Sequence, residues 1–207
     1  MSKNRPIYKQ IVIGVDQSYK NTGISIITDG VLRDIKSIQL EKYKANSKKR
    51  YVIRSHIKKL LELSTKRALS VVCIVERARI HGGPNSFINI DAIKAIGALT
   101  ATIVDVCAMY DVPVFSVDTR CWKSQVIGTS KGSPNKYGVP QEKWPTVKWC
   151  IDLGFEGKIL MPVNTRKTKG TFIRNGQKYQ YNDDAADSAG IAMFYIVGDR
   201  NKLKEEK

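Results

Sequence analysis

The stretch IVIGVD at residues 11–16 ends an apolar run with a carboxylate. The stretch VVCIVE at residues 71–76 repeats that pattern, and DDAADSAG at residues 183–190 opens a third apolar segment with acids. An acid beside a buried segment costs stability unless a cation satisfies it. We therefore expect the acids of these three segments to share a cationic ligand. They are Asp16, Glu76, Asp184 and Asp187.

Basic residues dominate the charge of this 207-residue chain. It carries 35 Lys and Arg against 19 Asp and Glu, which gives a net charge of +16. Such an excess is typical of proteins that bind nucleic acid, although a merely solvated basic surface is the alternative. Hydrophobic residues make up 42% of the chain, which suffices for a buried core and excludes a wholly disordered protein.

Two further features bear on where the protein works. Its four cysteines are scattered and lack the spacing of zinc ligands. They are Cys73, Cys107, Cys121 and Cys150. No stretch resembles a signal peptide, and none is long enough to cross a bilayer. We therefore expect a reduced, cytoplasmic setting and no membrane partner.

The spacing of apolar residues and turn signals predicts strands alternating with helices. We expect strands at residues 11–16, 23–28, 31–39, 71–76 and 113–117. We expect helices at residues 47–68, 90–110, 119–127, 141–152 and 183–197. Three antiparallel strands followed by parallel ones, with helices on either side, indicate an α/β fold around a five-stranded mixed sheet.

We expect a single domain at residues 11–198, between a flexible basic leader at residues 1–10 and a tail at residues 199–207. A basic segment at about residues 157–181 contains Asn175-Gly176 between two alternating runs, which is a strong hairpin signal. The helix at residues 90–110 is apolar over a wider face than one sheet needs. That face predicts either a dimer seam or full burial within one chain.

The acids of the last helix have a spacing that suits a metal site. Asp184 and Asp187 are three residues apart and share a helical face, with Asn182 as a good N-cap. Asp183 shares a face with Asp187 as well, so it is the rival ligand, and either first-turn acid could be an ordinary helix-start residue. Carboxylate oxygens suit Mg²⁺ or Mn²⁺, and a pair of such ions can hydrolyse a phosphodiester.

Together these residues resemble the RuvC family of Holliday-junction resolvases, which has an RNase H-like fold. Four motifs carry the resemblance. They are residues 13–18 with Thr22-Gly23, Ile74-Val75-Glu76, Trp122-Lys123 followed by Val126-Ile127-Gly128, and residues 184–189. The last motif, DAADSA, is close to the DAADA of the family. The resemblance covers residues 11 to about 197, apart from the basic segment.

The resemblance implies roles for particular residues. Asp16, Glu76, Asp184 and Asp187 match the four metal-binding carboxylates of the family, which hold two Mg²⁺ ions. Lys123 and Lys143 match the two lysines that assist near the scissile phosphate. Membership would also imply a homodimer, with the helix at residues 90–110 near its two-fold axis.

The chain departs from the family pattern at three points. Arg79 stands where an aromatic residue often wedges into the junction, and Gln17 stands where a Pro-Gly pair is usual. The basic segment at residues 157–181 looks inserted relative to bacterial members. These departures favour a bacteriophage-type relative, which would work in the cytoplasm of a bacterial host.

These observations predict a Mg²⁺-dependent endonuclease that cleaves Holliday junctions and other branched DNA such as forks. Basic residues in the loops and the hairpin would grip DNA phosphates. They are Arg77, Arg79, Lys131, Lys136, Arg166, Lys167, Lys169, Arg174 and Lys178. Two alternatives stay open: an RNase H-fold nuclease acting on RNA–DNA hybrids or flaps, and a junction-binding protein without catalysis.

Overall fold

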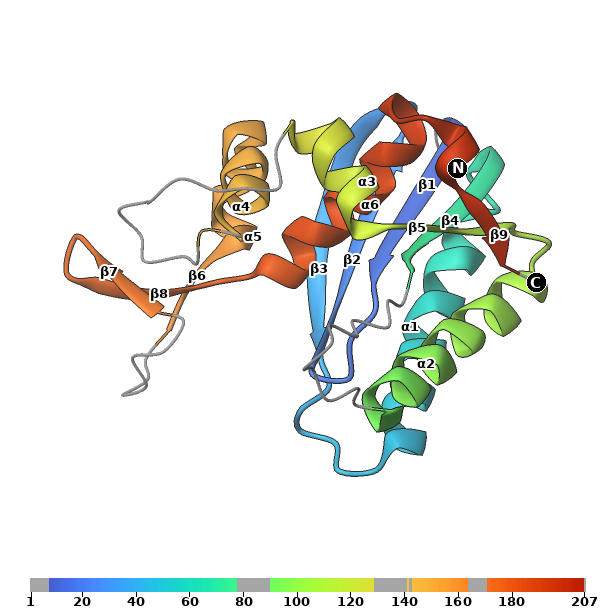
Figure 1. Ribbon diagram of the computed structural model, residues 1–207, viewed down its shortest axis with the longest axis horizontal. Coiled ribbons are helices and arrows are strands. Elements are labelled where there is room, and N and C mark those ends of the chain that lie inside the picture. Colours follow the sequence, from blue (N-terminus) through green and yellow to red (C-terminus); the bar gives the residue numbers. More distant parts are fainter. Residues whose placement is uncertain (1–7, 78–89, 129–140, 142, 164–170, 207) are drawn as a thin grey trace, which may run out of the picture.

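A computed structural model describes residues 8–77, 90–128, 141, 143–163 and 171–206 of the chain. Its centre is a mixed six-stranded sheet with the strand order β3-β2-β1-β4-β5-β9 (Figure 1). The strands are β1 (Tyr8–Asp16), β2 (Asn21–Thr28), β3 (Val31–Gln39), β4 (Ala68–Glu76), β5 (Val114–Val117) and β9 (Lys204–Glu206). Strands β1, β2 and β3 are antiparallel neighbours, whereas β1, β4 and β5 run parallel. This topology confirms the predicted α/β fold.

The prediction of five strands is wrong at the C-terminus, because part of the predicted tail forms a strand. Strand β9 pairs antiparallel with β5 and adds a sixth strand at that edge. A 3-10 helix, η3 (Arg200–Lys202), leads into it and is capped by Asp199, whose side chain accepts from the Asn201 amide at 3.0 Å. A three-residue strand of Lys and Glu has no apolar alternation, so its pairing depends on the open edge of β5. Residues 8–10 of the predicted leader belong to β1, and residues 1–7 lie outside the described part.

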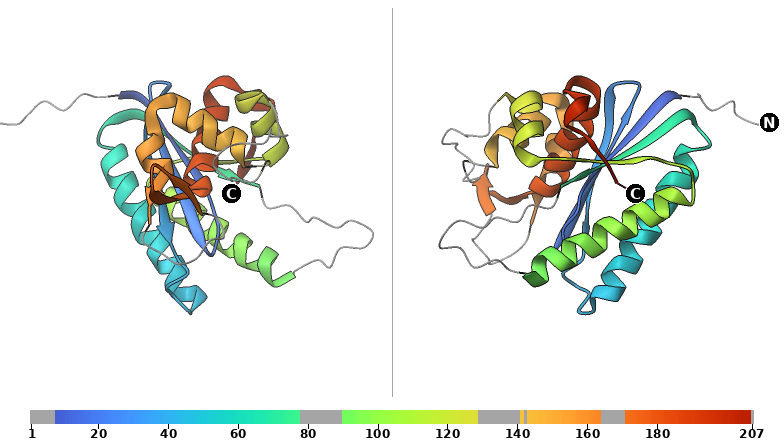
Figure 2. Two further views of the ribbon diagram at one scale, coloured as in Figure 1. Left: turned by 90° about the vertical axis from the view of Figure 1, so that its left-hand side faces the viewer. Right: turned by 45° about the vertical axis from the view of Figure 1, so that its right-hand side comes forward.

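Helices cover both faces of the sheet, as Figure 2 shows from the side. Helices α1 (Asn46–Ser64) and α2 (Ile90–Ala108) pack on one face against branched apolar side chains such as Ile13 and Val75. The long helix α6 (Asp183–Val197) packs on the other face, with α3 (Thr119–Trp122) and α4 (Trp144–Cys150) beside it. The chain therefore has two apolar cores, one on each side of the sheet.

Helix α6 approaches the sheet so closely that two strand positions must be glycine. A Cβ atom on Gly14 of β1 would lie 2.2 Å from the Ser188 carbonyl oxygen, and one on Gly23 of β2 would lie 1.8 Å from that of Asp184. The Ser25 hydroxyl also donates to the Ser188 carbonyl at 2.8 Å. These contacts fix α6 against β1 and β2 through its backbone.

The predicted basic segment forms a smaller, separate sheet with the order β6-β8-β7. Its strands are β6 (Leu160–Pro162), β7 (Thr171–Arg174) and β8 (Gln177–Tyr181). Asn175 and Gly176 both have positive φ, which is the conformation that a two-residue hairpin turn requires, so the predicted hairpin is confirmed. The connecting elements are η1 (Lys123–Ile127), η2 (Ile151–Phe155) and α5 (Glu156–Ile159), and Lys158 of α5 pairs with Asp34 of β3.

No helix within the described ranges is both long and apolar enough to span a membrane.

Candidate active site

Strand alternation brings two of the predicted acids to the same face of the sheet. Successive strand residues point to opposite faces, so Asp16 points to the same side as Val12, which packs with α6. Glu76 follows Val72 and Ile74 onto that side by the same rule. The parallel pairing of β1 with β4 runs through to Val15 and Val75, so both acids lie at one end of neighbouring strands.

Helix α6 supplies the other predicted acids from its first turns. The Asn182 side chain caps this helix, because its Oδ1 accepts from the Ala185 amide at 3.2 Å, as the sequence predicts. Asp187 is only 4% exposed and faces the sheet, while Asp183 and Asp184 are half-buried in the first turn. The close seating of α6 on Gly23 sets the Asp184 backbone directly over β2, next to the strand that ends at Asp16.

Burial, and after it mutual repulsion, raise the pKa values of three of these acids. Burial raises the pKa of Asp16 well above its ordinary value of 3.8, and the charges of Asp187, Glu76 and Asp184 raise it further. Burial also raises the pKa of Asp184 to about 7, with the neighbouring Asp183 charge adding to the effect. The pKa of Glu76 is raised mainly by burial. The four acids predicted from the sequence therefore form one electrostatic cluster that a cation would stabilise.

Both predicted lysines lie at this cluster. Lys143 Nζ is 2.9 Å from Asp183 Oδ2 and 3.4 Å from Asp187 Oδ2, and Lys123 Nζ is 3.8 Å from the same Asp187 oxygen. Burial alone would lower the pKa of Lys143, but the charges of Asp187 and Asp183 raise it overall, so this amine stays protonated. The two rival acids differ in their surroundings, because Asp183 forms an ion pair with Lys143, whereas the charge of Asp184 raises the pKa of Asp16.

The residues fit a hard divalent cation by their chemistry. Among the described residues, Asp187 Oδ1 is a buried oxygen without a hydrogen-bond partner, which is costly unless something cationic satisfies it. Oxygen ligands of this kind suit Mg²⁺ or Mn²⁺. In that same part of the chain, no three His, Cys, Asp or Glu side chains are already gathered as one ligand set. Metal binding at these acids stays a prediction.

Sequence reasoning missed the residues that hold Glu76. The Thr119 hydroxyl donates to Glu76 Oε1 at 2.5 Å, and the Trp122 indole donates to Oε2 at 3.3 Å. The Gln17 side chain hydrogen-bonds the main chain of Glu76. A buried indole needs a partner for its N–H, and Trp122 comes soon after a strand that neighbours Glu76. That need was the one available signal for the contact.

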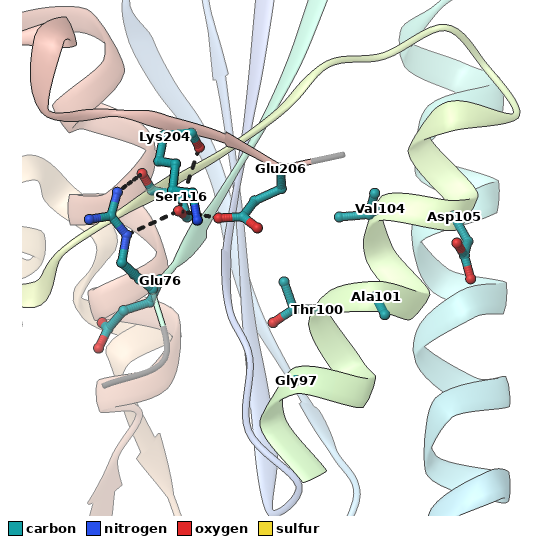
Figure 3. Close-up of a pocket in the computed structure, with 10 residues that line it drawn as sticks. Glu76, Gly97, Thr100, Ala101, Val104, Asp105, Ser116, Lys204 and Glu206 are labelled. Atoms are coloured by element: carbon teal, nitrogen blue, oxygen red, sulfur yellow. Dashed lines mark hydrogen bonds between the residues drawn. The ribbon is translucent and has the colours of Figure 1, made fainter. Parts of the chain in front are cut away.

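A cleft of about 510 Å³ opens beside Glu76, between α2 and β9 (Figure 3). Arg77 lines it and donates to the Ser116 hydroxyl at 3.3 Å, and that hydroxyl donates to Glu206 Oε1 at 2.6 Å. Arg77 is thus the one residue of the predicted DNA-binding set that lies next to the acids in the described structure.

The other predicted DNA-binding residues are not brought to the acids by the described structure. Lys178 lies on β8 and Arg174 on β7, in the smaller sheet. Six more lie outside the described residues. They are Arg79, Lys131, Lys136, Arg166, Lys167 and Lys169.

No protein family model matches the sequence, and no curated protein matches it. The solved structures that match nearly the whole chain include three from two proteins. RuvC of Thermus thermophilus in complex with a Holliday junction substrate matches with 11% identity and a TM-score of 0.58, over 95% of this chain and 99% of its own. A second structure of that RuvC matches with 14% identity and a TM-score of 0.53, with the same coverage.

The third is the yeast mitochondrial Holliday junction resolvase Ydc2. It matches with 15% identity and a TM-score of 0.52, over 93% of this chain and 80% of its own. The chain therefore has the RNase H-like fold of the RuvC resolvases, as the sequence motifs predict. The bacteriophage-type relationship stays a prediction.

Proposed function

We propose that this protein is a metal-dependent, structure-selective endonuclease that cleaves Holliday junctions, and other branched DNA, by phosphodiester hydrolysis. The observation that carries the proposal is the convergence of four buried or half-buried acids and two lysines on a RuvC-like fold. The net charge of +16 supports a polyanionic substrate.

Asp16, Glu76, Asp184 and Asp187 would hold the metal, with Mg²⁺ expected and Mn²⁺ as a substitute. We infer that Asp184 rather than Asp183 belongs to this set, because Asp184 interacts with Asp16 while Asp183 pairs with Lys143. A pair of such ions, when bound, activates water and stabilises the leaving oxygen of a phosphodiester.

The lysines would act on the substrate phosphate. Lys143 and Lys123 both have their ammonium groups within 4 Å of the Asp187 carboxylate, so both lie at the edge of the acid cluster. Positive charge fixed there would stabilise the negative charge that builds on the phosphate oxygens during hydrolysis. Arg77, which directly follows Glu76 in the sequence, would contact the DNA backbone beside the acid cluster.

A homodimer would bring two such centres to opposite strands of a junction. Helix α2 supports this arrangement, because Ile90 and Met109 near its ends are each 59% exposed and Gly97 and Ala101 lie exposed between them. An arginine at Ala101 should block close helix approach and yield monomers. Light scattering coupled to size exclusion measures this, and a monomeric wild-type protein would contradict the dimer.

The direct test compares four synthetic substrates of equal length: a four-way junction, a fork, a flap and an RNA–DNA hybrid. We expect the junction and the fork to be cut in Mg²⁺ and left intact in EDTA. Preferential cutting of the hybrid or the flap would instead indicate a different nuclease on this fold. Tight junction binding with no cutting in Mg²⁺ or Mn²⁺ would indicate a binding protein.

A further inference from the structure

Gln17 directly follows Asp16 and is 6% exposed, and its side chain joins three elements of the fold. Strand alternation sends it to the opposite side of the sheet from Asp16, towards α2. There its Oε1 accepts from the Glu76 amide at 3.2 Å, while its Nε2 donates to the Glu76 carbonyl. The same Nε2 donates to the Thr100 hydroxyl of α2 at 3.2 Å.

The orientation of this carboxamide is fixed by its partners. Nε2 has two hydrogens and faces two acceptors, while Oε1 faces a donor, so a flipped amide would oppose like groups. The Thr100 hydroxyl donates its own hydrogen to the Ile96 carbonyl at 3.1 Å, which leaves a lone pair for Gln17. Every polar atom of the side chain is thereby engaged in one arrangement.

Glu76 is consequently held at both ends. Gln17 fixes its main chain at the point where the ladder between β1 and β4 stops, after Val15 and Val75. Thr119 and Trp122 fix its two carboxylate oxygens from the far side. Because Gln17 is covalently joined to Asp16, its hydrogen bonds to the Glu76 main chain fix the distance between Asp16 and Glu76.

We propose that Gln17 is a positioning residue that fixes Asp16 relative to Glu76 and ties both acids to helix α2 through Thr100. This inference rests on the proposed function, since it matters only if both acids bind metal. Residues that orient metal ligands in this way commonly change metal affinity or activity by about 10- to 100-fold when they are removed. If Gln17 only held the ends of β1 and β4 together, its removal would change stability and leave metal affinity unchanged.

The test uses Gln17→Met, which keeps side-chain length and removes all three hydrogen bonds. Binding of Mn²⁺ to the full-length, DNA-free protein is followed by electron paramagnetic resonance, alongside thermal unfolding. We expect the Mn²⁺ concentration for half-occupancy to rise about tenfold or more. A folded Gln17→Met protein with wild-type Mn²⁺ affinity would overturn the inference.

Variants of Thr100 provide an independent test if Gln17→Met does not fold. Thr100→Val removes the acceptor and should weaken Mn²⁺ binding, whereas Thr100→Ser keeps the hydroxyl and should restore it. Thr102→Val is the matched control, because that hydroxyl donates to the Ala98 carbonyl at 2.8 Å on the same helix, and among the described residues it forms no hydrogen bond with Gln17. Equal affinities for Thr100→Val and Thr102→Val would count against the coupling to α2.

Failure of the positioning role and failure of the proposed function would give different results. If the wild-type protein binds Mn²⁺ and cuts junctions while Gln17→Met does the same at equal metal concentrations, only the positioning role is lost. If the wild-type protein neither binds Mn²⁺ nor cuts branched DNA, the proposed function is lost and the inference with it.

Discussion

The two faces of the central sheet are packed in different ways. On the α1–α2 face, branched side chains such as Ile57 and Leu61 fill the space between helices and strands. On the α6 face, Gly14 and Gly23 let the backbone of a helix rest on the strands. Side-chain packing tolerates small adjustments, whereas backbone contact does not. The acids belong to the face with the least freedom, where a shift of the helix would move them.

The largest expected effect is the loss of an acid from the α6 face. Asp187→Asn should lower junction cleavage by about 10³-fold, because a metal contributes several kcal/mol to such a reaction and each 1.36 kcal/mol is tenfold in rate. Junction binding should survive, since the charge removed is negative. Cleavage is measured in single-turnover gel assays and binding by anisotropy.

The matched control for that change is Asp152→Asn, which alters an exposed acid that pairs with Lys148. It should cut at the wild-type rate. A wild-type rate for Asp187→Asn would show that the acid cluster is not the catalytic centre.

The second-largest effect is expected from a single added methyl group, which should distinguish the two faces of the sheet. A Cβ on Gly23 would lie 1.8 Å from the Asp184 carbonyl, so Gly23→Ala should displace α6, lower stability by about 3 kcal/mol and reduce cleavage as well. Deleting one methylene on the other face, with Ile57→Val, should cost about 1 kcal/mol and leave cleavage intact. Thermal unfolding and cleavage rates are compared for both, and equal losses of cleavage would remove the contrast between the faces.

The raised pKa of Asp184 predicts a pH-dependent difference in stability. Because burial raises this pKa from 3.8 to about 7, the folded protein holds the proton more tightly than the unfolded chain. The stability that protonated Asp184 contributes to the fold is therefore fully present below about pH 4 and is lost as pH rises through about 7. Without metal, the melting temperature of Asp184→Asn should be close to that of the wild type near pH 4. It should exceed the wild-type value increasingly towards pH 8.

Mg²⁺ should reverse this difference, because the wild-type carboxylate gains a cation that the amide cannot hold as well. Melting temperatures in EDTA and in Mg²⁺, measured across this pH range, test both statements. A constant gap between the two proteins at every pH would show that Asp184 does not titrate in this window.

The smallest effect is expected on the outer surface of α1. Lys58 and Lys59 are exposed, and the Lys58–Glu62 pair is long at 3.9 Å, so it contributes roughly 0–0.5 kcal/mol. Changing both lysines to glutamine should leave cleavage within about twofold and melting within a few degrees. A large fall in junction affinity would make α1 part of the DNA-binding surface.

The acids could be predicted from the sequence because burial makes them conspicuous. A carboxylate that ends an apolar strand, as Glu76 does, is unusual enough to indicate a ligand. The neutral residues around it carry no such signal, since Thr119 and Gln17 are ordinary polar residues until the fold gives them partners. Strand β9 could not be predicted either, because its residues are charged and its pairing depends on an edge formed by a strand far earlier in the chain.

The two outermost strands of the large sheet bear on how the protein behaves at high concentration. Strand β3 exposes Arg33 and Lys36, and strand β9 exposes Lys204 and Glu205. Charged side chains on edge strands oppose the edge-to-edge pairing that starts aggregation. The protein should therefore stay dispersed when crowded, and any self-association that it does show should run through helices rather than through an extended sheet.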